Sequence, residues 1–375
     1  MDHPLRDAMG GFRRFESVAK TGQWAQGGQC GGMTEERELR IGIVGAGRIV
    51  KQRHMPGLRA LPGIKITAVA NSTLESAQRF CAEYAPEAKP FARWEEVVDN
   101  EDVDIVWVGA TPDMHHDATD FGLRRGKHVF CQARMASTLA EAEGMWEASI
   151  RFPELVSAIC PAPHGLKGGE VMKKLLADGA IGVPHQALLH SFNAGWLDPE
   201  APLHWRQQMD ISGIQILTLG IYVEVLHRWL GQIVEVEARG NVVIAERPGG
   251  EVDVPDFLHV LARFRSGLEA TLLFSGVAAH APGDKLWIFG SEGTLTYDFN
   301  TDEIQLGKRG EAAMETIPIP SGMEGGWTVE RDFIAAVRNP TGPRPKPDFT
   351  EGICYMRVVD AINRSLDGDG VVSVG

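Results

Sequence analysis

The feature that most constrains this chain is a hydrophobic strand that runs into a glycine turn and then a helix. Residues 41–50 read IGIVGAGRIV. Gly45 permits a turn too tight for a Cβ atom, and Gly47 lets the backbone approach a ligand closely. The following helix directs free N–H groups and its positive dipole end at that point, which suits a pyrophosphate. Because Val50 replaces the third glycine of the usual G-x-G-x-x-G pattern, the prediction of a dinucleotide site also depends on the residues that follow.

Apolar runs alternate with helix-like segments over the next 120 residues. Strands are predicted at 39–44, 64–70, 104–108, 128–130 and 155–160. Helices are predicted at 48–60, 74–84, 94–99, 115–124 and 137–148, the last capped by Ser137. Strands that alternate with helices of this length are typical of a parallel sheet covered on both faces. We therefore expect a Rossmann NAD(P)-binding domain over residues 39–160.

The pattern changes after residue 160, where longer runs alternate between apolar and polar residues. These runs lie at 186–192, 233–245, 257–265, 269–274, 286–289 and 294–299, and helices are predicted at 170–177, 214–230, 327–338 and 350–366. Such alternation predicts a mostly antiparallel open sheet with one wet face. The fold class is therefore α/β, with a second domain at 161–375.

The first 38 residues differ from the rest, since they are rich in Gly, Gln and charge and have no apolar period. Arg13-Arg14 resembles a twin-arginine export signal, but no hydrophobic stretch follows it. We expect residues 1–38 to be a disordered extension, or Met33 to lie closer to the true start.

The net charge and the cysteine spacing limit which binding partners and which cellular compartment we expect. A formal net charge of −13 argues against nucleic acid or an anionic membrane, and no apolar run reaches the roughly 18 residues that span a bilayer. The five cysteines are scattered and form no C-x-x-C pair. That usage is typical of reduced intracellular thiols, so we expect a cytoplasmic protein without a structural metal.

Several segments in the same order resemble the Gfo/Idh/MocA oxidoreductases. They are the glycine turn with His54 after it, Ala110-Thr111-Pro112 with His116 beyond, the run Gly126-Lys127-His128-Val129, LLADGAIG at 175–182, Gly220 with Arg228-Trp229-Leu230, and the closing helix at 352–365. The resemblance covers about residues 39–366. It implies a Rossmann domain followed by an open-sheet domain, and a bound nicotinamide dinucleotide.

The resemblance also implies a set of cofactor-binding residues. These are Gly45, Gly47, Arg48, Ile49, Asn71, Ser72, Ala110, Thr111, Pro112, His116 and Gln132. An acidic residue after the second strand would select NAD, but this chain has the neutral run Asn71-Ser72-Thr73. No arginine follows at once to hold a 2′-phosphate. The cofactor is therefore NADP or NAD, and the neutral run favours NADP.

The catalytic positions depart from the resembled pattern. The family usually has C-E-K-P where this chain has Cys131-Gln132-Ala133-Arg134, and D-x-G-x-H where it has Thr218-Leu219-Gly220-Ile221-Tyr222. Hydride transfer from an alcohol needs a group that accepts the hydroxyl proton. We expect Tyr222 to carry that proton, with Arg134 as its electrostatic partner. The alternatives are that Tyr222 is only a pocket wall and that Arg134 forms a surface or interdomain ion pair.

Histidine offers a second route for the proton. His204 lies in the loop before the long helix, and His164 begins the second domain. Either imidazole could act as the base. Trp196 and Trp205 could stack on a sugar ring, or simply pack in the core.

These residues predict an NAD(P)-dependent oxidoreductase that acts on a sugar, cyclitol or related polyhydroxy compound. Two alternatives stay open: a lyase or hydrolase that oxidises its substrate transiently with bound cofactor, and a non-catalytic dinucleotide sensor. The loss of the usual lysine at Ala133 and aspartate at Thr218 is the argument for the sensor. By analogy with the family we expect residues 161–375 to serve substrate binding and oligomerisation, and the protein to be a homodimer or homotetramer.

Overall fold

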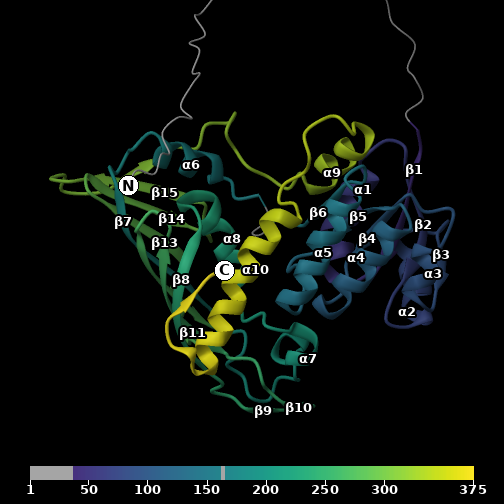
Figure 1. The fold of residues 1–375 in the computed structure, drawn as a ribbon, viewed down its shortest axis with the longest axis horizontal. Coiled ribbons are helices and arrows are strands. Elements are labelled where there is room, and N and C mark those ends of the chain that lie inside the picture. Colours follow the sequence, from purple (N-terminus) through teal and green to yellow (C-terminus); the bar gives the residue numbers. More distant parts are fainter. Residues whose placement is uncertain (1–36, 162–164) are drawn as a thin grey trace, which may run out of the picture. The chain divides into compact units, whose positions relative to one another are not determined.

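The computed structural model describes residues 37–161 and 165–375, so the expected extension up to residue 36 and His164 lie outside the described residues. The first sheet has the order β3-β2-β1-β4-β5-β6, and all its pairs are parallel (Figure 1). Its strands are β1 (Leu39–Val44), β2 (Ile64–Ala70), β3 (Lys89–Phe91), β4 (Ile105–Val108), β5 (His128–Cys131) and β6 (Ser157–Ile159). The predicted Rossmann sheet is confirmed, and the short edge strand β3 is an addition to it. Because the strand order reverses between β1 and β4, a ligand crevice is expected at their carboxyl ends.

Alternate residues of these strands point into two cores, as the period of a strand requires. Ile41 and Ile43 face one core, which also contains side chains of α1 (Met55–Arg59), α2 (Leu74–Tyr84) and α9 (Val329–Arg338). Val44 faces the other core, with α3 (Trp94–Val98), α4 (His115–Arg124) and α5 (Leu139–Arg151). Helix α9 comes late in the chain, yet it packs on the first sheet.

Two helix starts differ from the prediction. Helix α5 begins at Leu139 with Thr138 as its N-cap, because Thr138 and Glu141 form a reciprocal capping box. The predicted helix at 48–60 contains a π-helical turn, Val50–His54, directly before α1, and Pro56 occupies the first turn of α1.

The second sheet has nine strands in the order β16-β15-β14-β13-β7-β12-β11-β8-β17. They are β7 (Pro184–Phe192), β8 (Ile233–Asn241), β11 (Phe257–Phe264), β12 (Glu269–Ser275), β13 (Gly283–Gly290), β14 (Gly293–Asp298), β15 (Glu303–Lys308), β16 (Glu315–Ile317) and β17 (Val372–Ser373). Only β7 and β12 pair in parallel. The predicted, mostly antiparallel sheet is confirmed, and the edge strands β15, β16 and β17 extend it. A separate two-stranded ribbon is formed by β9 (Glu246–Arg247) and β10 (Gly250–Glu251).

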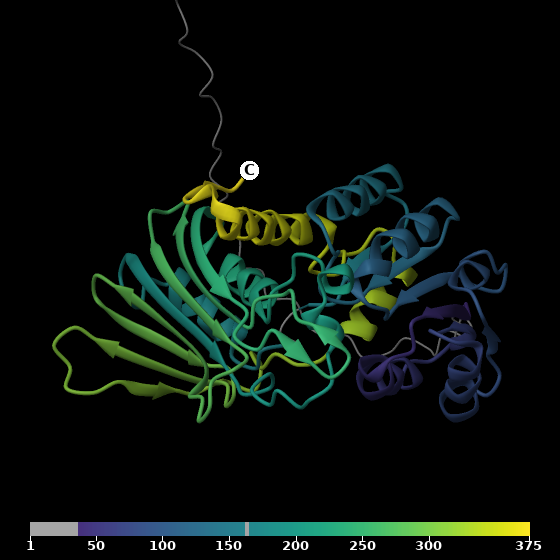
Figure 2. The same cartoon turned by 90° about the horizontal axis from the view of Figure 1, so that it is seen from below.

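Helices cover one face of this second sheet. They are α6 (Gly169–Ala177), α8 (Leu219–Leu230) and α10 (Phe349–Arg364), and Figure 2 shows α10, in yellow, lying along the sheet. Along β11, Leu258 and Val260 are buried, whereas Leu261 is 55% exposed. The sheet therefore has one covered and one open face, as its alternation predicted.

Helix α8 starts five residues later than the prediction of Ile214. Leu217 adopts a left-handed φ of +45°, which a continuous helix does not allow. Gly213 lies at φ +61°, and a Cβ there would approach the carbonyl oxygen of Ser137 to 2.0 Å. This close approach brings the start of α8 against the segment after β5. Among the described residues, no helix is long and apolar enough to cross a membrane.

Candidate active site

A cavity of about 1100 Å³ opens along the carboxyl edge of the first sheet and continues to residues that follow β7. Residues at or just beyond the ends of β1, β2, β4 and β5 form most of its wall. The second half of the chain contributes His204, Trp205, Arg206 and Ile221. The cavity therefore joins the predicted crevice of the Rossmann sheet to the second domain.

The glycine turn has the shape that a pyrophosphate requires. Gly45 lies at φ +84°, and a Cβ there would come within 2.5 Å of the Ala110 backbone. A Cβ at Gly47 would have as its nearest neighbour the carbonyl oxygen of Gly109, at 4.0 Å, so the turn is open on the ligand side. The Asn71 side chain accepts a hydrogen bond of 3.3 Å from the backbone N–H of Ala46 and fixes the turn. The first turn of the following helix leaves N–H groups free for an anion, so these residues fit a dinucleotide.

Val50 does not disturb this arrangement. Its Cγ2 atom packs where a Cβ of Gly109 would lie, at 2.3 Å from that position. The glycine that allows close packing between the helix and the sheet is thus Gly109, directly after β4, and not position 50.

Ten of the eleven predicted cofactor residues line the cavity. They are Gly45, Gly47, Arg48, Ile49, Asn71, Ser72, Ala110, Thr111, Pro112 and Gln132. Their contacts with a dinucleotide remain a prediction. The cavity wall also contains four residues near the adenosine side that the sequence analysis missed, Gln52, Arg93, Trp94 and Glu95. The last three lie at the start of α3, and no pattern in the sequence alone placed that helix beside β2.

His116 is the exception, and here the prediction is corrected. The His116 side chain pairs with Asp117, at 2.8 Å, and is not part of the cavity wall. Its neighbour His115 is fully buried and bonds the carbonyl oxygens of Ala110, at 3.1 Å, and Arg134, at 2.8 Å. The buried positions of α4 are 115, 118, 119, 122 and 123, so the helical period identifies residue 115 as the inward one.

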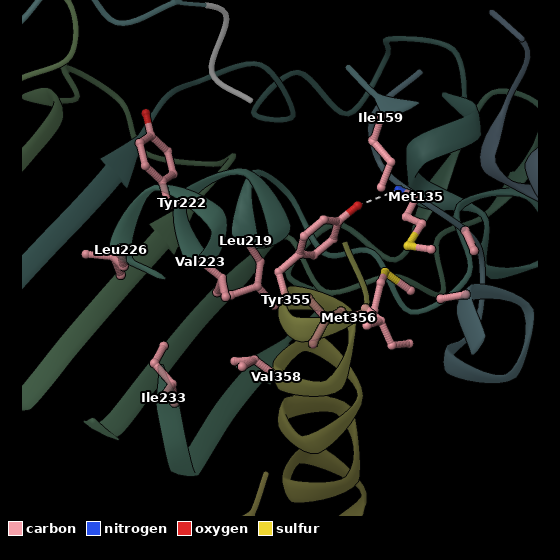
Figure 3. Close-up of a cluster of buried hydrophobic side chains, with 14 of the residues drawn as sticks. Met135, Ile159, Leu219, Tyr222, Val223, Leu226, Ile233, Tyr355, Met356 and Val358 are labelled. Carbon is pink, nitrogen blue, oxygen red and sulfur yellow. Dashed lines mark hydrogen bonds between the residues drawn. The ribbon is translucent and has the colours of Figure 1, made fainter. Parts of the chain in front are cut away.

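The segment after β5 is held from both halves of the chain. The Met135 N–H donates to the Tyr355 hydroxyl on α10, at 2.5 Å (Figure 3), and Gln215 Nε2 donates to the Ala136 carbonyl, at 3.1 Å. The Ile214 N–H donates to the Ser137 carbonyl, at 2.8 Å. These bonds fix the backbone on which Arg134 lies.

Arg134 is brought into the cavity wall with 6% of its surface exposed. Its Nε has no hydrogen-bond partner among the described residues. Burial, and secondarily the charge of Arg206, lowers the pKa of Arg134 to about 10. Arg134 therefore remains a cation at neutral pH, and the alternative of a surface ion pair does not apply to it.

His204 and Arg206 enter the cavity from a single turn, Trp205–Gln207. His204 Nδ1 accepts the Arg206 backbone N–H at 3.1 Å, so the neutral ring carries its proton on Nε2. Burial, Arg206 and Arg48 all lower the pKa of His204 below its ordinary value. The Arg206 guanidinium lies over the Trp205 ring, 4.1 Å from its centroid.

Tyr222 lies elsewhere, which corrects the expected partnership with Arg134. The Tyr222 side chain is 4% exposed, does not line the cavity, and donates its hydroxyl hydrogen bond to Asp284. In Figure 3 its ring points away from the bond between Tyr355 and Met135. Burial and Asp284 raise the pKa of Tyr222, whereas a nearby cation was expected to lower it. The preceding residue, Ile221, faces the cavity instead.

The other residues named from the sequence fall into two groups. Trp205 lines the cavity, whereas Trp196 packs against His204 with its ring centroid 5.2 Å away and is not in the wall. The Thr218 hydroxyl bonds the Ser191 hydroxyl at 2.9 Å, also outside the cavity. Arg206 was missed, although its place directly after His204 and Trp205 was a signal.

Two family profiles match the chain. Residues 39–158 match "Oxidoreductase family, NAD-binding Rossmann fold", and residues 170–296 match "GFO/IDH/MocA C-terminal domain". Together they cover most of the two sheets described above.

Characterised relatives extend over most of the chain. Levoglucosan dehydrogenase of Pseudarthrobacter phenanthrenivorans is 25% identical, over 90% of this chain and 98% of the relative. A dTDP-3,4-didehydro-2,6-dideoxy-alpha-D-glucose 3-reductase of Streptomyces antibioticus is 29% identical over 81% and 90%. The 1,5-anhydro-D-fructose reductase of Ensifer adhaerens is 30% identical over 62% of this chain and 67% of the relative.

Solved structures share the fold. An oxidoreductase domain protein from Kribbella flavida superposes with a TM-score of 0.79 at 23% identity, over 90% of this chain and all of that one. Levoglucosan dehydrogenase in complex with NADH and levoglucosan gives a TM-score of 0.77 at 22% identity, over 90% and 99%. The profiles, the relatives and the two-sheet architecture agree that this chain belongs to the Gfo/Idh/MocA family of NAD-binding oxidoreductases.

Proposed function

We propose that the protein transfers hydride between a nicotinamide dinucleotide and a sugar, cyclitol or related polyhydroxy compound. The observation that carries this proposal is the continuity of one cavity from the Gly45–Gly47 turn to His204 and Ile221. Its volume of about 1100 Å³ exceeds the roughly 300–1,000 Å³ of a typical site for one small ligand. There is room for a dinucleotide and a second small molecule.

The relatives support the substrate class, since their names all refer to sugar derivatives. Trp205 is in the same wall as Arg134, but its ring already contacts the Arg206 guanidinium at 4.1 Å and the His204 ring at 5.5 Å. The polar neighbours Gln132 and His204 can hydrogen-bond hydroxyl groups.

Different residues of the cavity have different roles in the proposed reaction. A bound nicotinamide supplies the hydride acceptor or donor. The Gly45–Gly47 turn binds the pyrophosphate through backbone N–H groups, and Arg134 and Ile221 contribute to the same cavity wall from the segment after β5 and from α8. Arg134 is too basic to act as the proton acceptor, but its planar donors can orient or polarise an oxygen group.

His204 takes the role of proton carrier in this proposal. Among the described residues that line the cavity, it is the one side chain that ordinarily titrates near neutral pH. Its lowered pKa keeps the ring neutral at pH 7, which is the form able to accept a proton from a hydroxyl group. Before Nε2 can accept the substrate proton, the proton that it carries must move to Nδ1. That move breaks the hydrogen bond from the Arg206 N–H to Nδ1.

The choice between NAD and NADP follows from the wall near β2. Ser72 is neutral. The one carboxylate among the described residues of the wall is Glu95, and it accepts a hydrogen bond of 3.0 Å from Arg93. Because the described part of this wall contains no other acidic side chain, we propose that the protein accepts NADP as well as NAD, with NADP favoured.

The test is absorbance at 340 nm over a panel of polyols, cyclitols and ketosugars, with each cofactor in turn. Turnover of at least one polyhydroxy compound is expected. Binding of NAD(P)H without turnover of any of them would contradict the proposal and leave a dinucleotide sensor. Turnover of a glycoside with no net change in cofactor would instead indicate a lyase or hydrolase.

A further inference from the structure

Three arginines contribute to the cavity wall from different elements. Arg134 enters from the segment after β5, Arg206 from the turn at 205–207, and Arg48 from the helix after β1. None of the three forms an ion pair with a described residue. The one carboxylate among the described residues of the wall is Glu95, which belongs to the adenosine side and pairs with Arg93.

The burial of Arg134 makes this arrangement unfavourable without a ligand. Its side chain has lost nearly all contact with water, and its Nε has no acceptor among the described residues. A buried charge without a partner is destabilising, because it loses its hydrogen bonds to water and gains none from the protein in return. Arg206 adds repulsion, since its charge disfavours the charged form of Arg134, and Arg48 does the same to Arg206. A bound anion would offset both the burial of Arg134 and the repulsion between the arginines.

Position separates Arg134 from the part of the cavity that the pyrophosphate occupies. The glycine turn follows β1, whereas Arg134 follows β5, and β4 lies between these strands. Neighbouring strands are about 4.8 Å apart, so the two backbone segments are roughly 10 Å apart along the edge. Arg134 instead contacts the second domain, where a Cβ at Gly220 would lie 3.4 Å from its Cδ. This is the substrate end of the cavity.

Resting on the proposed function, we propose that the polyhydroxy substrate carries an anionic oxygen group, a carboxylate or a phosphate ester, which Arg134 binds and Arg206 supports. The planar guanidinium fork matches both groups through two parallel hydrogen bonds. Arg134 is itself only 6% exposed, and a low local dielectric strengthens charge pairing.

Calorimetric titration of the protein loaded with NADPH tests this inference without turnover. The probes are sorbitol, its acid counterpart gluconate, and sorbitol 6-phosphate, together with five-carbon and cyclitol equivalents of each. At least one anionic probe is expected to bind roughly 30-fold more tightly than its neutral counterpart. If the carboxylate probes bind more tightly than the phosphate probes, the anionic group of the substrate is a carboxylate. The reverse order identifies a phosphate ester.

Variants assign the effect to the arginines. Arg134→Met is expected to remove the preference for the anion while changing the NADPH dissociation constant less than about threefold. Arg206→Met should reduce the preference in part, and it remains informative if Arg134→Met does not fold. Arg79→Met, which removes a mostly exposed charge on α2, is the matched control and should leave the preference unchanged.

Two results would overturn the inference: equal affinity for every neutral and anionic pair, or an equal loss of NADPH and anion affinity in Arg134→Met. The second would show that Arg134 serves the cofactor. Failure of the proposed function has a different signature, since anion binding would persist while no compound in the panel was oxidised or reduced.

Discussion

The hydroxyl of Tyr222 on α8 donates a hydrogen bond to the carboxylate of Asp284 on β13, beneath the helices that cover the second sheet. This bond occupies the one polar atom that would have carried a proton. Burial raises the pKa of Tyr222, and the bond to Asp284 raises it further, because ionisation would place two negative charges side by side.

Tyr222→Phe should therefore affect stability more than activity. The substitution leaves the Asp284 carboxylate without its donor, so the free energy of unfolding should fall by about 1–2 kcal/mol. Denaturant unfolding measures that loss, and kcat/KM for the best substrate of the panel should stay within a few-fold. A variant of unchanged stability that has lost most of its activity would restore Tyr222 as the proton carrier.

Gly47→Asp should abolish most dinucleotide binding. The open side of the turn would then hold a carboxylate where the pyrophosphate binds, and we expect the NAD(P)H dissociation constant to rise roughly 100-fold. Fluorescence titration with NADPH measures it. Gly47→Ala is the matched control, since a Cβ meets no atom closer than 4.0 Å, and it should cost less than about tenfold. Unchanged affinity in Gly47→Asp would mean that the pyrophosphate lies elsewhere.

The pH dependence of oxidation should report His204. Its neutral form is the proton acceptor and its pKa is lowered, so kcat/KM should rise with pH to a plateau whose midpoint lies below about 6.5. His204→Asn keeps an acceptor for the Arg206 N–H but cannot titrate. It should lower the plateau roughly 100-fold and remove the acidic limb.

His204→Gln separates proton transfer from hydrogen bonding. Its amide can place a donor near the position of Nε2 without accepting a proton. Full activity in this variant would show that His204 only donates a hydrogen bond to the substrate, and that another group carries the proton.

Stability should fall in mild acid because of His227 on α8. Burial lowers its pKa to about 4, from an ordinary value of 6.5, and its Nε2 accepts the Ile233 N–H at 3.3 Å. The unfolded chain therefore binds a proton between pH 6.5 and 4 that the folded chain excludes, so stability present above pH 6.5 is lost as the pH falls toward 4. His115 and His128 have lowered pKa values of the same sign.

The contribution of His227 alone comes from comparison with His227→Gln, which keeps an acceptor for Ile233. Urea unfolding at pH 7 and pH 4.5 measures how far the free energy of unfolding falls between these two pH values. That fall should be about 2 kcal/mol smaller in the variant than in the parent protein. An identical decrease in both proteins would assign the acid sensitivity to other groups.

Local patterns in the sequence were enough to predict the elements that depend on neighbouring residues. The strand and glycine turn at 41–47, the parallel βα alternation, and the alternating runs of the second sheet follow from period and backbone sterics, and the structure confirms them. The edge strands β15 and β16 were not predicted, because short half-exposed strands carry little hydrophobic alternation.

Side-chain direction depended on contacts between distant segments. The start of α8 is set by the approach of Gly213 to Ser137, and that start turns Ile221 toward the cavity and Tyr222 toward Asp284. One residue along a helix rotates a side chain by about 100°, so a small change in where α8 begins decides which residue faces the ligand.

The sequence by itself thus determined the family, the two sheets and the dinucleotide turn, since each is encoded within a short stretch of chain. Only the tertiary structure decided which cations share the cavity. Arg134 and Arg206 are 72 positions apart in the sequence, and their common site exists because the segment after β5 is bonded to Gln215 and Tyr355 of the second half. Attraction and repulsion between charges depend on distance in space, which sequence separation does not give.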